Sequence, residues 1–387
     1  MNILILSENY YPNVSGVPVV VKYLAEGLVA LGHNVDIATS NFKECPKEEV
    51  IEGVCVHRFN IYKDHLDRNK GDINTYLDFV LNFKADAIVF ECLQCATTDI
   101  ILPHLEKLKA RRILHSHGIS GVRLKPFEKK KDLVHTIANT YHWAYYKRYY
   151  RSFMPSRIKL FDCVISLSEV DDTIAYCKQH GVETLILGNA VEDVFLEPTG
   201  KVEQPDIVAL QKPYFVSVAY YNQIKGQINI LEEYYKTGFH DHAMVFIGPS
   251  KNEYYNSLLD ANSKWERQYG KRDVLFLTAV DRHLIPNIIG NAKLYLVGST
   301  IEQFSIAMVE TMAKGVPFVS TNVGNACLLP GGVVVSDISS MHKAITDIIK
   351  DENMYSNLSQ KGVEYVKENC VRKQVIKKME SIIQSVI

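Results

Sequence analysis

The 387-residue chain lacks several features that would assign it at once to a broad class of proteins. It has no apolar run of about 18 residues, so the sequence predicts no membrane-spanning helix. Its first residues have no basic lead-in and run directly into polar Ser7-Glu8-Asn9, which is typical of a buried strand and not of a signal peptide. We therefore expect a cytoplasmic protein. The composition, 47% apolar and 22% charged, excludes an extended disordered chain.

Cysteine and metal-ligand patterns are sparse. The eight cysteines stand at irregular spacings, which does not indicate a disulfide scaffold. Cys92 and Cys95 form a C-x-x-C, but no second pair completes four ligands, which disfavours a redox or zinc function. There is no D-x-D sequence, and His115 and His117 have no acidic third ligand near them in the sequence. We expect neither a metal nor another cofactor.

Charge is spread unevenly along the chain. The net charge is −1, yet residues 107–160 contain 14 Lys or Arg and only two acids. Such asymmetry indicates a polyanionic partner near one face of the first half. Within this block, residues 141–153 (YHWAYYKRYYRSF) suit a membrane interface, or alternatively a core helix whose tyrosines pack inward while Lys and Arg reach solvent. Nucleic-acid binding is disfavoured, because no recognised module is present.

Strand-like and helix-like segments alternate in two stretches, which predicts an α/β protein with parallel sheets covered by helices. Strands are expected in the first stretch at 2–6, 35–39, 54–59, 87–90, 113–115, 163–167 and 184–187, and in the second at 214–219, 244–248, 274–278, 294–298 and 316–320. Residues 198–213 between them contain three prolines and a glycine and form the best linker candidate. We expect two Rossmann-like doubly wound domains, 1–197 and 214–370.

The most informative segment is EQFSIAMVE, in which Glu302 and Glu310 stand eight residues apart. Apolar strand-length runs flank a helical pattern over 305–314 that Gly315 ends, so the segment is typical of a nucleotide-binding βαβ unit. Glu302 would follow a strand, and the backbone amides of the next residues would lie at a helix N-terminus, where anions bind. Glu310, about two turns along that helix, can accept hydrogen bonds from the hydroxyls of a ribose.

This segment resembles the E-x7-E donor signature of the family 4 retaining glycosyltransferases, which have the GT-B fold. The likeness covers nearly the whole chain. Residues 1–40 resemble the opening strand, glycine loop, helix and G-H-x-V strand of the family, with the loop at 12–17. Weaker matches are HSHG at 115–118, GNAV at 188–191 with Phe195, KG at 225–226 and FIGP at 246–249. The resemblance implies two domains that face each other across a cleft, with a last helix at about 371–387 packing back on the first.

The resemblance also implies a role for each matching residue. The donor diphosphate would be held by Gly16, by the backbone of Phe304, Ser305 and Ile306, and by Lys225; Glu310 would bind the ribose, Glu302 the donor sugar hydroxyls, and His117 the sugar near the reacting centre. His117, Glu302 and Lys225 are thus the candidate catalytic residues. One departure stands out, because Tyr220 occupies the position five residues before Lys225 where the family usually has Arg.

The implied function is transfer of a hexose from a nucleotide sugar, with UDP favoured, to a cell-surface glycan precursor such as one for lipopolysaccharide or capsule. The acceptor is expected to be lipid-linked, with residues 107–160 contacting the inner face of the plasma membrane peripherally. The family retains the anomeric configuration, so a leaving-group phosphate oxygen would take the acceptor proton. Two alternatives remain open: a GT-B-fold nucleotide-sugar epimerase, and a non-catalytic protein that binds a nucleotide sugar or lipid.

Overall fold

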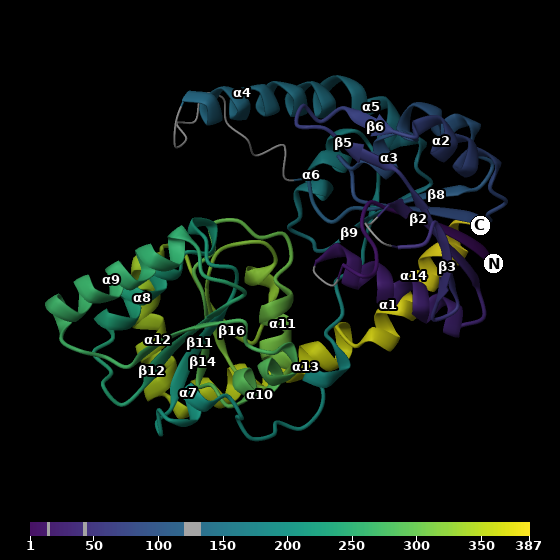
Figure 1. Ribbon diagram of the computed structural model, residues 1–387. Coiled ribbons are helices and arrows are strands. Elements are labelled where there is room, and N and C mark those ends of the chain that lie inside the picture. The colour runs from purple at the N-terminus through teal and green to yellow at the C-terminus, as the bar shows by residue number, and fades with distance from the viewer. Residues whose placement is uncertain (14–15, 42–44, 120–132) are drawn as a thin grey trace. The chain divides into compact units, whose positions relative to one another are not determined.

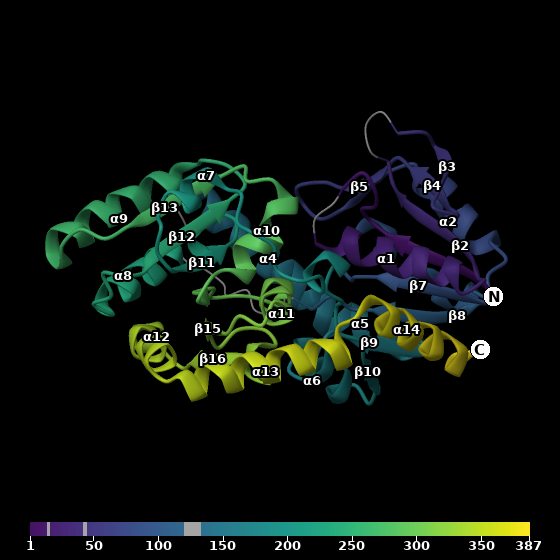
Figure 2. The same cartoon turned by 90° about the horizontal axis from the view of Figure 1, so that it is seen from below.

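The computed structural model describes residues 1–13, 16–41, 45–119 and 133–387 (Figures 1 and 2). The chain forms two compact units. Unit 1 comprises Met1–Gly188 together with Val375–Ile387, and unit 2 comprises Asn189–Gln374. Each unit is an α/β domain built on a parallel sheet.

Unit 1 contains an eight-stranded sheet in the order β10-β9-β8-β7-β1-β2-β4-β3. Its strands are β1 (Asn2–Ser7), β2 (Asn34–Ser40), β3 (Glu48–Ile51), β4 (Val54–Phe59), β7 (Ala87–Glu91), β8 (Arg111–His115), β9 (Cys163–Ser166) and β10 (Thr184–Ile186). Only β3 is antiparallel to its neighbour. A separate hairpin pairs β5 (Ile61–Lys63) with β6 (Asn69–Gly71). The strands β1 and β7 are almost wholly buried, as their continuous apolar runs predict for central parallel strands.

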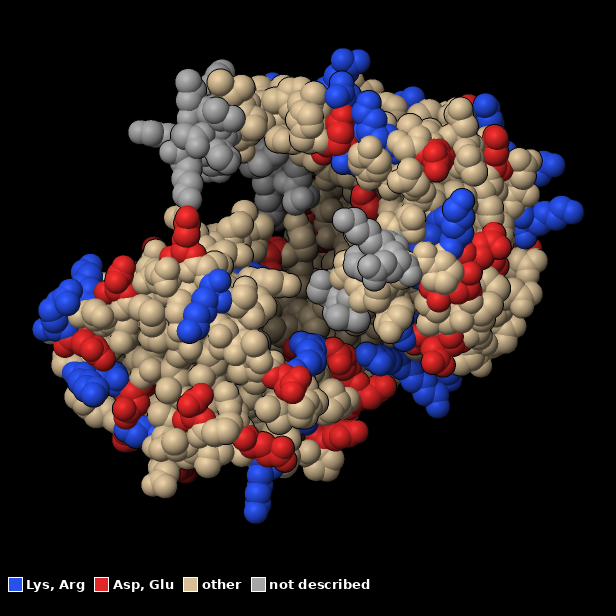
Figure 3. Space-filling model, viewed as in Figure 1, with Lys and Arg blue, Asp and Glu red and all other residues tan. Residues whose placement is uncertain are grey.

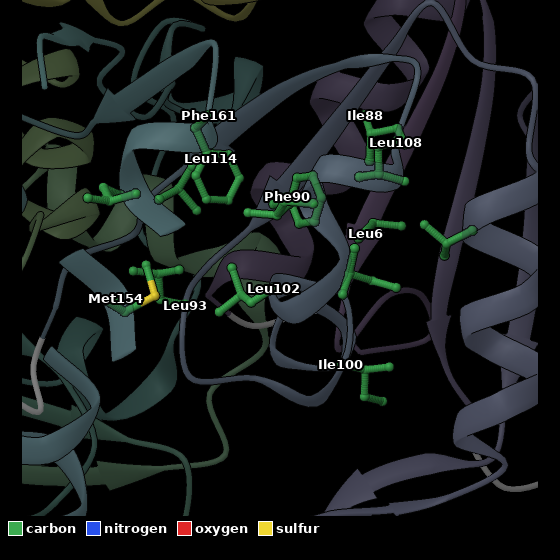
Figure 4. Close-up of a cluster of buried hydrophobic side chains, with 14 of the residues drawn as sticks. Leu6, Ile88, Phe90, Leu93, Ile100, Leu102, Leu108, Leu114, Met154 and Phe161 are labelled. Atoms are coloured by element: carbon green, nitrogen blue, oxygen red, sulfur yellow. The ribbon is translucent and has the colours of Figure 1, made fainter. Parts of the chain in front are cut away.

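The helices of unit 1 cover this sheet. They are α1 (Val17–Ala30), α2 (Ile73–Asn82), α3 (Ala96–Asp99), α4 (Leu133–Arg148), α5 (Met154–Arg157), α6 (Asp172–Gln179) and α14 (Arg372–Val386), with 3-10 turns η1 (Leu102–Lys107) and η4 (Ile158–Leu160). Side chains from neighbouring strands, among them Leu6, Phe90 and Leu114, meet Leu102 and Met154 in one core (Figure 4). These contacts fix the carboxyl ends of the central strands, where the polar residues of unit 1 lie.

The C-terminal helix α14 belongs to unit 1. It contacts α1, because the side chain of Ile376 fills the space in which a Cβ at Gly27 would stand. His33 Nε2 lies 2.8 Å from Glu380 Oε1 beside that contact, within hydrogen-bond distance. A larger residue at position 27 would therefore push the two helices apart.

Unit 2 contains a six-stranded, fully parallel sheet in the order β13-β12-β11-β14-β15-β16. Its strands are β11 (Tyr214–Val218), β12 (Ala243–Gly248), β13 (Val274–Thr278), β14 (Leu294–Val297), β15 (Phe318–Thr321) and β16 (Gly332–Val335). Its longer helices are α8 (Gln227–Lys236), α9 (Glu253–Tyr269), α10 (Ile285–Gly290), α11 (Ile306–Ala313), α12 (Met341–Lys350) and α13 (Glu352–Asn369), and short helical turns include η6 (Gln223–Lys225) and η7 (Arg282–Leu284). The strand order reverses direction between β11 and β14, the switch point at which such sheets bind ligands.

The segment 198–213, expected as a linker, instead packs on unit 2. The Gly200 amide donates to Asn287 Oδ1 at 2.9 Å, and Ile207 of the short helix α7 (Pro205–Val208) is buried in the unit 2 core. The unit begins at Asn189 because Val191 pairs with Val371 in an isolated bridge. Prolines and glycine mark irregular backbone correctly here, but irregular backbone can still be tightly packed.

The aromatic and basic segment continues α4 into a π-helical turn, Tyr149–Phe153, and then into α5 (Figure 1). Tyr149 and Tyr150 are buried, whereas Lys147, Arg148 and Arg151 are exposed, which matches the core-helix interpretation at this end. In Figure 3, Lys and Arg of unit 1 are scattered among Asp and Glu. Part of the basic block, 120–132, lies outside the described residues. Along the described chain, each helix is too short or too polar to span a bilayer.

Candidate functional site

In unit 2 a pair of polar turns meets at the carboxyl ends of β11 and β14. Lys225 ends η6, and its Nζ donates to Glu302 Oε1 at 2.6 Å. Ser299 Oγ donates to the same carboxylate oxygen at 2.7 Å. The structure thus brings together two of the three candidate catalytic residues, 77 positions apart in sequence. Glu302 retains a second oxygen that can accept hydrogen bonds.

The spacing of these turns is set by backbone contact at Gly226. This glycine has φ +65°, and a Cβ at its position would lie 2.1 Å from the carbonyl oxygen of Gly298. No other residue fits without moving one of the turns. The Thr300 amide donates to the Ile224 carbonyl at 2.8 Å and ties the same turns together. Lys225 is therefore held opposite Glu302 by the backbone itself.

The turn after Glu302 leads into α11 through Ser305. The Ser305 side chain caps the helix by accepting from the Met308 amide, and its own amide donates to Asn325 Oδ1 at 3.1 Å. The following amides, beginning with Ile306, belong to the first helical turn, where backbone N–H groups have no intrahelical acceptor. Phe304 and Ile306 are partly buried beside them. The segment can offer an anion the dipole and donors of a helix N-terminus.

Glu310 lies within α11 and is 4% exposed. Arg282 of η7 donates through Nη2 to Glu310 Oε1 at 2.9 Å and to Glu192 Oε1 at 2.5 Å. The pKa of Glu310 is raised to about 6, chiefly by burial and also by the nearby Glu192, against the lowering influence of Arg282. At neutral pH Glu310 is thus a carboxylate that a single shared guanidinium only partly compensates, so it has capacity to accept from ligand hydroxyls.

Tyr295 is a buried tyrosine of unit 2 whose hydroxyl reaches the end of a neighbouring strand. It is buried in β14, and its hydroxyl donates to the Val218 carbonyl at 2.9 Å at the end of β11. Burial raises the pKa of Tyr295, and the electrostatic influence of Glu310 and Glu302 raises it further. The Tyr295 hydroxyl therefore lies at the carboxyl end of β11, beside the switch point between β11 and β14.

In unit 1, His117 lies just after β8 and contacts a residue that sequence reasoning missed. Glu91 ends β7, and the parallel register sets it directly beside His115. Its Oε2 is 2.7 Å from His117 Nε2 and 3.0 Å from His115 Nδ1. Both Glu91 and His115 are 1% exposed. The acidic partner absent from the nearby sequence is thus supplied by the neighbouring strand.

The charges of this cluster fix the tautomer of His117. Burial by itself would raise the pKa of Glu91, but the two imidazoles lower it to about 2. Burial and the neighbouring His115 lower the pKa of His117. At neutral pH Glu91 is ionised and can only accept, so His117 is neutral and carries its proton on Nε2. Its Nδ1 is then the ring atom that can accept a hydrogen bond from a substrate hydroxyl.

Two imidazoles and a carboxylate are also groups that a metal could use, and their ligand atoms lie within 4.8 Å of one another. Direct hydrogen bonds from both rings to Glu91 account for their positions without an ion. The sequence-based expectation of metal independence stays a prediction.

The remaining candidate positions lie as follows. Gly16 precedes α1 with φ +66° and has open space where a Cβ would stand, so its backbone conformation, and not crowding, favours glycine. The rest of the expected phosphate loop includes residues 14–15, which lie outside the described residues. The Tyr220 side chain is 60% exposed, close in sequence to Lys225. Arg282, the cation that pairs with Glu310, comes from a different loop, after β13.

Comparison with known protein families gives two matches along the chain. Residues 14–175 match the family described as Glycosyltransferase Family 4, and residues 202–365 match Glycosyl transferases group 1. Together they cover most of both units. No curated protein matches the sequence significantly.

Solved structures resemble the whole chain. A sucrose-phosphate synthase from Thermosynechococcus elongatus has a TM-score of 0.73 at 15% identity, with 100% of this chain and 98% of that one covered. A trehalose-6-phosphate protein from E. coli bound with UDP-2-fluoro glucose gives 0.72 at 13%, with both chains fully covered. A trehalose-phosphate synthase from Burkholderia xenovorans in complex with glucose-6-phosphate gives 0.69 at 13%, covering 99% and 100%.

These likenesses confirm the predicted α/β fold with two Rossmann-like domains. Together with the family matches, they also confirm the class of enzyme predicted from the E-x7-E segment. The chain belongs to the family 4 glycosyltransferases of the GT-B fold.

Proposed function

We propose that unit 2 binds the nucleotide-sugar donor at the cluster formed by Lys225, Glu302, the start of α11 and Glu310. The observation that carries this proposal is the 2.6 Å pair of Lys225 with Glu302, which stands three residues before Ser305, the N-cap of α11. A diphosphate there can accept from Lys225 and from the first amides of α11. Glu310 then accepts from the ribose hydroxyls. A UDP sugar is the proposed donor, since a structural neighbour binds UDP-2-fluoro glucose.

In this proposal the donor rearranges the Lys225–Glu302 pair. The incoming diphosphate attracts the ammonium of Lys225, which frees a Glu302 oxygen for the hydroxyls of the donor sugar. When the glycosidic bond to the diphosphate breaks, Lys225 stabilises the charge that grows on the leaving oxygen. That oxygen takes the proton of the acceptor hydroxyl as the new bond forms on the same face, so the anomeric configuration is retained and no protein base is needed.

Unit 1 contributes groups for the donor as well as for the acceptor in this proposal. His117, whose neutral Nδ1 can accept a hydrogen bond, would position a hydroxyl of the donor sugar, and Gly16 would bind the donor phosphates through its backbone. The proposed acceptor is a phosphorylated glycan precursor, lipid-linked in the cell. A neighbour in complex with glucose-6-phosphate supports the class of sugar phosphate acceptors. Exposed Ile137 and Tyr141 on α4, with Lys147 nearby, support peripheral contact with an anionic membrane.

Calorimetric titration with UDP, GDP and ADP without added metal tests the donor site. We expect selective binding of UDP that Glu310→Ala and Lys225→Ala each weaken at least tenfold. Glu368→Ala, which removes an exposed carboxylate from α13, is the matched control and should leave affinity unchanged. Thermal unfolding of each variant separates loss of binding from loss of fold. Wild-type protein that binds none of the three nucleotides would refute the proposed donor site.

Donor turnover separates the catalytic proposal from its alternatives. Incubation with a panel of UDP sugars should release UDP slowly by hydrolysis and faster once a suitable acceptor is present. Interconversion of sugar epimers without an acceptor would instead support an epimerase. Nucleotide binding without any turnover would support the non-catalytic alternative. That alternative is considered because Tyr220 stands where the family usually has an arginine.

A further inference from the structure

Unit 1 contains a cavity of about 250 Å³ that the donor site does not involve. It is lined by Asn69, Asp99, Tyr145, Arg148, Tyr149 and Phe153. The lining comes from the β5–β6 hairpin, α3, α4 and the π-helical turn, all within described parts of unit 1. The volume lies just below the range of roughly 300–1,000 Å³ that drug-sized ligands occupy, so it suits a group of about the size of one sugar.

Side-chain hydrogen bonds hold the cavity's walls together. Tyr141 donates to the Leu66 carbonyl at 3.1 Å, Tyr145 donates to the Asp67 carbonyl at 3.3 Å, and His142 Nδ1 lies 2.8 Å from Asp67 Oδ2. Three successive contacts therefore anchor α4 to the loop between β5 and β6. Such walls are preformed and do not need to be ordered by a ligand.

The floor of the cavity is a closed polar network. Asp99 is 8% exposed, and its two oxygens accept from Lys63 Nζ at 2.6 Å and from the Tyr149 hydroxyl at 2.7 Å. The carboxylate is thus neutralised and hydrogen-bonded on both sides. It closes the cavity without leaving a bare negative charge that would repel an anion.

Two groups at the cavity have no partner among the residues that the structure describes. Asn69 Oδ1 is shielded from solvent and accepts no hydrogen bond from the described residues. Arg148 is exposed at the rim, and no carboxylate in the described parts of the chain pairs with it. A buried acceptor without a donor is costly unless a ligand supplies one. A hydroxyl for Asn69 and an anion for Arg148 are the chemistry that would complete the site.

The remaining wall is aromatic. Tyr145, Tyr149 and Phe153 follow one another along α4 and the π-helical turn, with ring centroids of Tyr149 and Phe153 5.6 Å apart. The wider π-turn lies where these rings face the cavity, and such turns are frequent at functional sites. Apolar rings combined with a few polar groups are typical of small-molecule sites.

We propose that this cavity is the acceptor subsite and that it binds a phosphorylated monosaccharide. The sugar ring packs on Tyr145 and Phe153, a sugar hydroxyl donates to Asn69 Oδ1, and the phosphate pairs with Arg148. Its role as acceptor rests on the proposed glycosyl transfer, whereas binding of the sugar phosphate does not. The same chemistry is offered by a soluble sugar phosphate and by the headgroup of a lipid-linked one.

Calorimetry on the full chain tests the proposal with the α-1-phosphates of glucose, galactose, mannose and N-acetylglucosamine. Decyl glucosyl phosphate supplies the lipid-linked form, and inorganic phosphate supplies the anion alone. We expect saturable binding of at least one sugar phosphate, weakened about 10–100-fold by Arg148→Gln and about fivefold by Asn69→Ala. Arg151→Gln, which removes an exposed arginine outside the cavity lining, is the matched control and should change affinity less than twofold.

Each outcome of these titrations either supports the proposed sugar-phosphate site or overturns it. Binding of the soluble phosphates identifies a free sugar phosphate, and binding of the decyl form alone identifies a lipid-linked one. The proposal is overturned if no sugar phosphate binds, if inorganic phosphate binds equally well, or if both arginine variants weaken binding alike. UDP affinity measured on the same samples reports on the donor site of unit 2, so failure of the cavity and failure of the proposed function are separate results.

Discussion

Each unit buries a carboxylate at its candidate site, yet the pKa of one is lowered and the pKa of the other is raised. Glu91 in unit 1 is 1% exposed and Glu310 in unit 2 is 4% exposed, and burial raises the pKa of both. Two imidazoles contact Glu91 and bring its pKa to about 2, whereas Glu310 has one guanidinium, shared with Glu192, and its pKa is about 6. The partners, and not the depth of burial, decide the charge state. The first carboxylate orients an imidazole, and the second remains available to a ligand.

The largest expected effect comes from changing the partner of His117. In Glu91→Gln the amide can donate to Nε2, which favours the opposite tautomer and removes the acceptor at Nδ1. We expect kcat for donor turnover to fall about 10–100-fold, as for loss of a charge-assisted hydrogen bond, with UDP affinity unchanged. Steady-state kinetics beside UDP titration will measure both.

The control for this substitution is Glu169→Gln, which alters an exposed carboxylate of unit 1. It should leave kcat within twofold of wild type. If Glu91→Gln changes UDP affinity and leaves kcat intact, Glu91 does not act through His117.

The next largest effect is expected from removing Arg282, the cation that pairs with Glu310. Arg282→Gln removes the group that opposes burial, so the pKa of Glu310 should rise above its present value of about 6. If the pKa reaches about 8, roughly nine tenths of the population is protonated at pH 7, so UDP affinity should fall about tenfold and recover toward pH 9. Titration at both pH values measures this recovery. Arg267→Gln, at an exposed position on α9, should show no such pH dependence.

A smaller effect concerns stability. Because the folded-state pKa of Glu310, about 6, exceeds the ordinary value of 4.5, its contribution to stability is present below pH 4.5 and is lost as pH rises through 6. Glu310→Gln mimics the protonated form. It should raise the free energy of unfolding at pH 8 by up to ~2 kcal/mol and leave it unchanged at pH 4. Denaturant titration at the two pH values measures the difference, and a loss of stability at pH 8 would contradict it.

The smallest expected effect is a gain. The Tyr220 side chain is exposed, and its backbone carbonyl accepts a hydrogen bond from the Gln227 side chain. Tyr220→Arg should restore the cation that the family usually has and tighten UDP binding about two- to fivefold at low salt, with the gain reduced by added salt. Tyr62→Arg, an exposed tyrosine of unit 1, is the control. An unchanged affinity would show that Arg282 or the backbone already meets the need for positive charge.

The local parts of the site could be predicted from the sequence. The βαβ unit was expected from an apolar run, a helical pattern and Gly315, and the structure has β14, α11 and β15 there. Glu302 and Glu310 follow from that order, because their positions depend only on neighbouring residues. The roles proposed for them and for Gly16 stay predictions.

The partners of these residues could not be predicted in the same way. Arg282 is 28 residues from Glu310, Asn325 is 20 from Ser305, and Glu91 is 26 from His117. Each comes from a different loop or strand, so the pairing depends on sheet order, which the pattern of apolar residues leaves open. A carboxylate directly after a predicted parallel strand, here the strand 87–90, was a signal that could have drawn attention to Glu91.

The backbone contact at Gly226 limits how the donor site can vary. In a library of all substitutions at this position, every variant should lose donor turnover nearly as completely as loss of Lys225 itself. Gly226 contributes no reactive group. In such a library its loss of turnover would nevertheless be as severe as that of a residue that contacts the substrate, because the backbone of the two turns leaves no room for a side chain. Variation that tunes donor choice must therefore arise in the side chains around these two turns, while the distance between the turns stays constant.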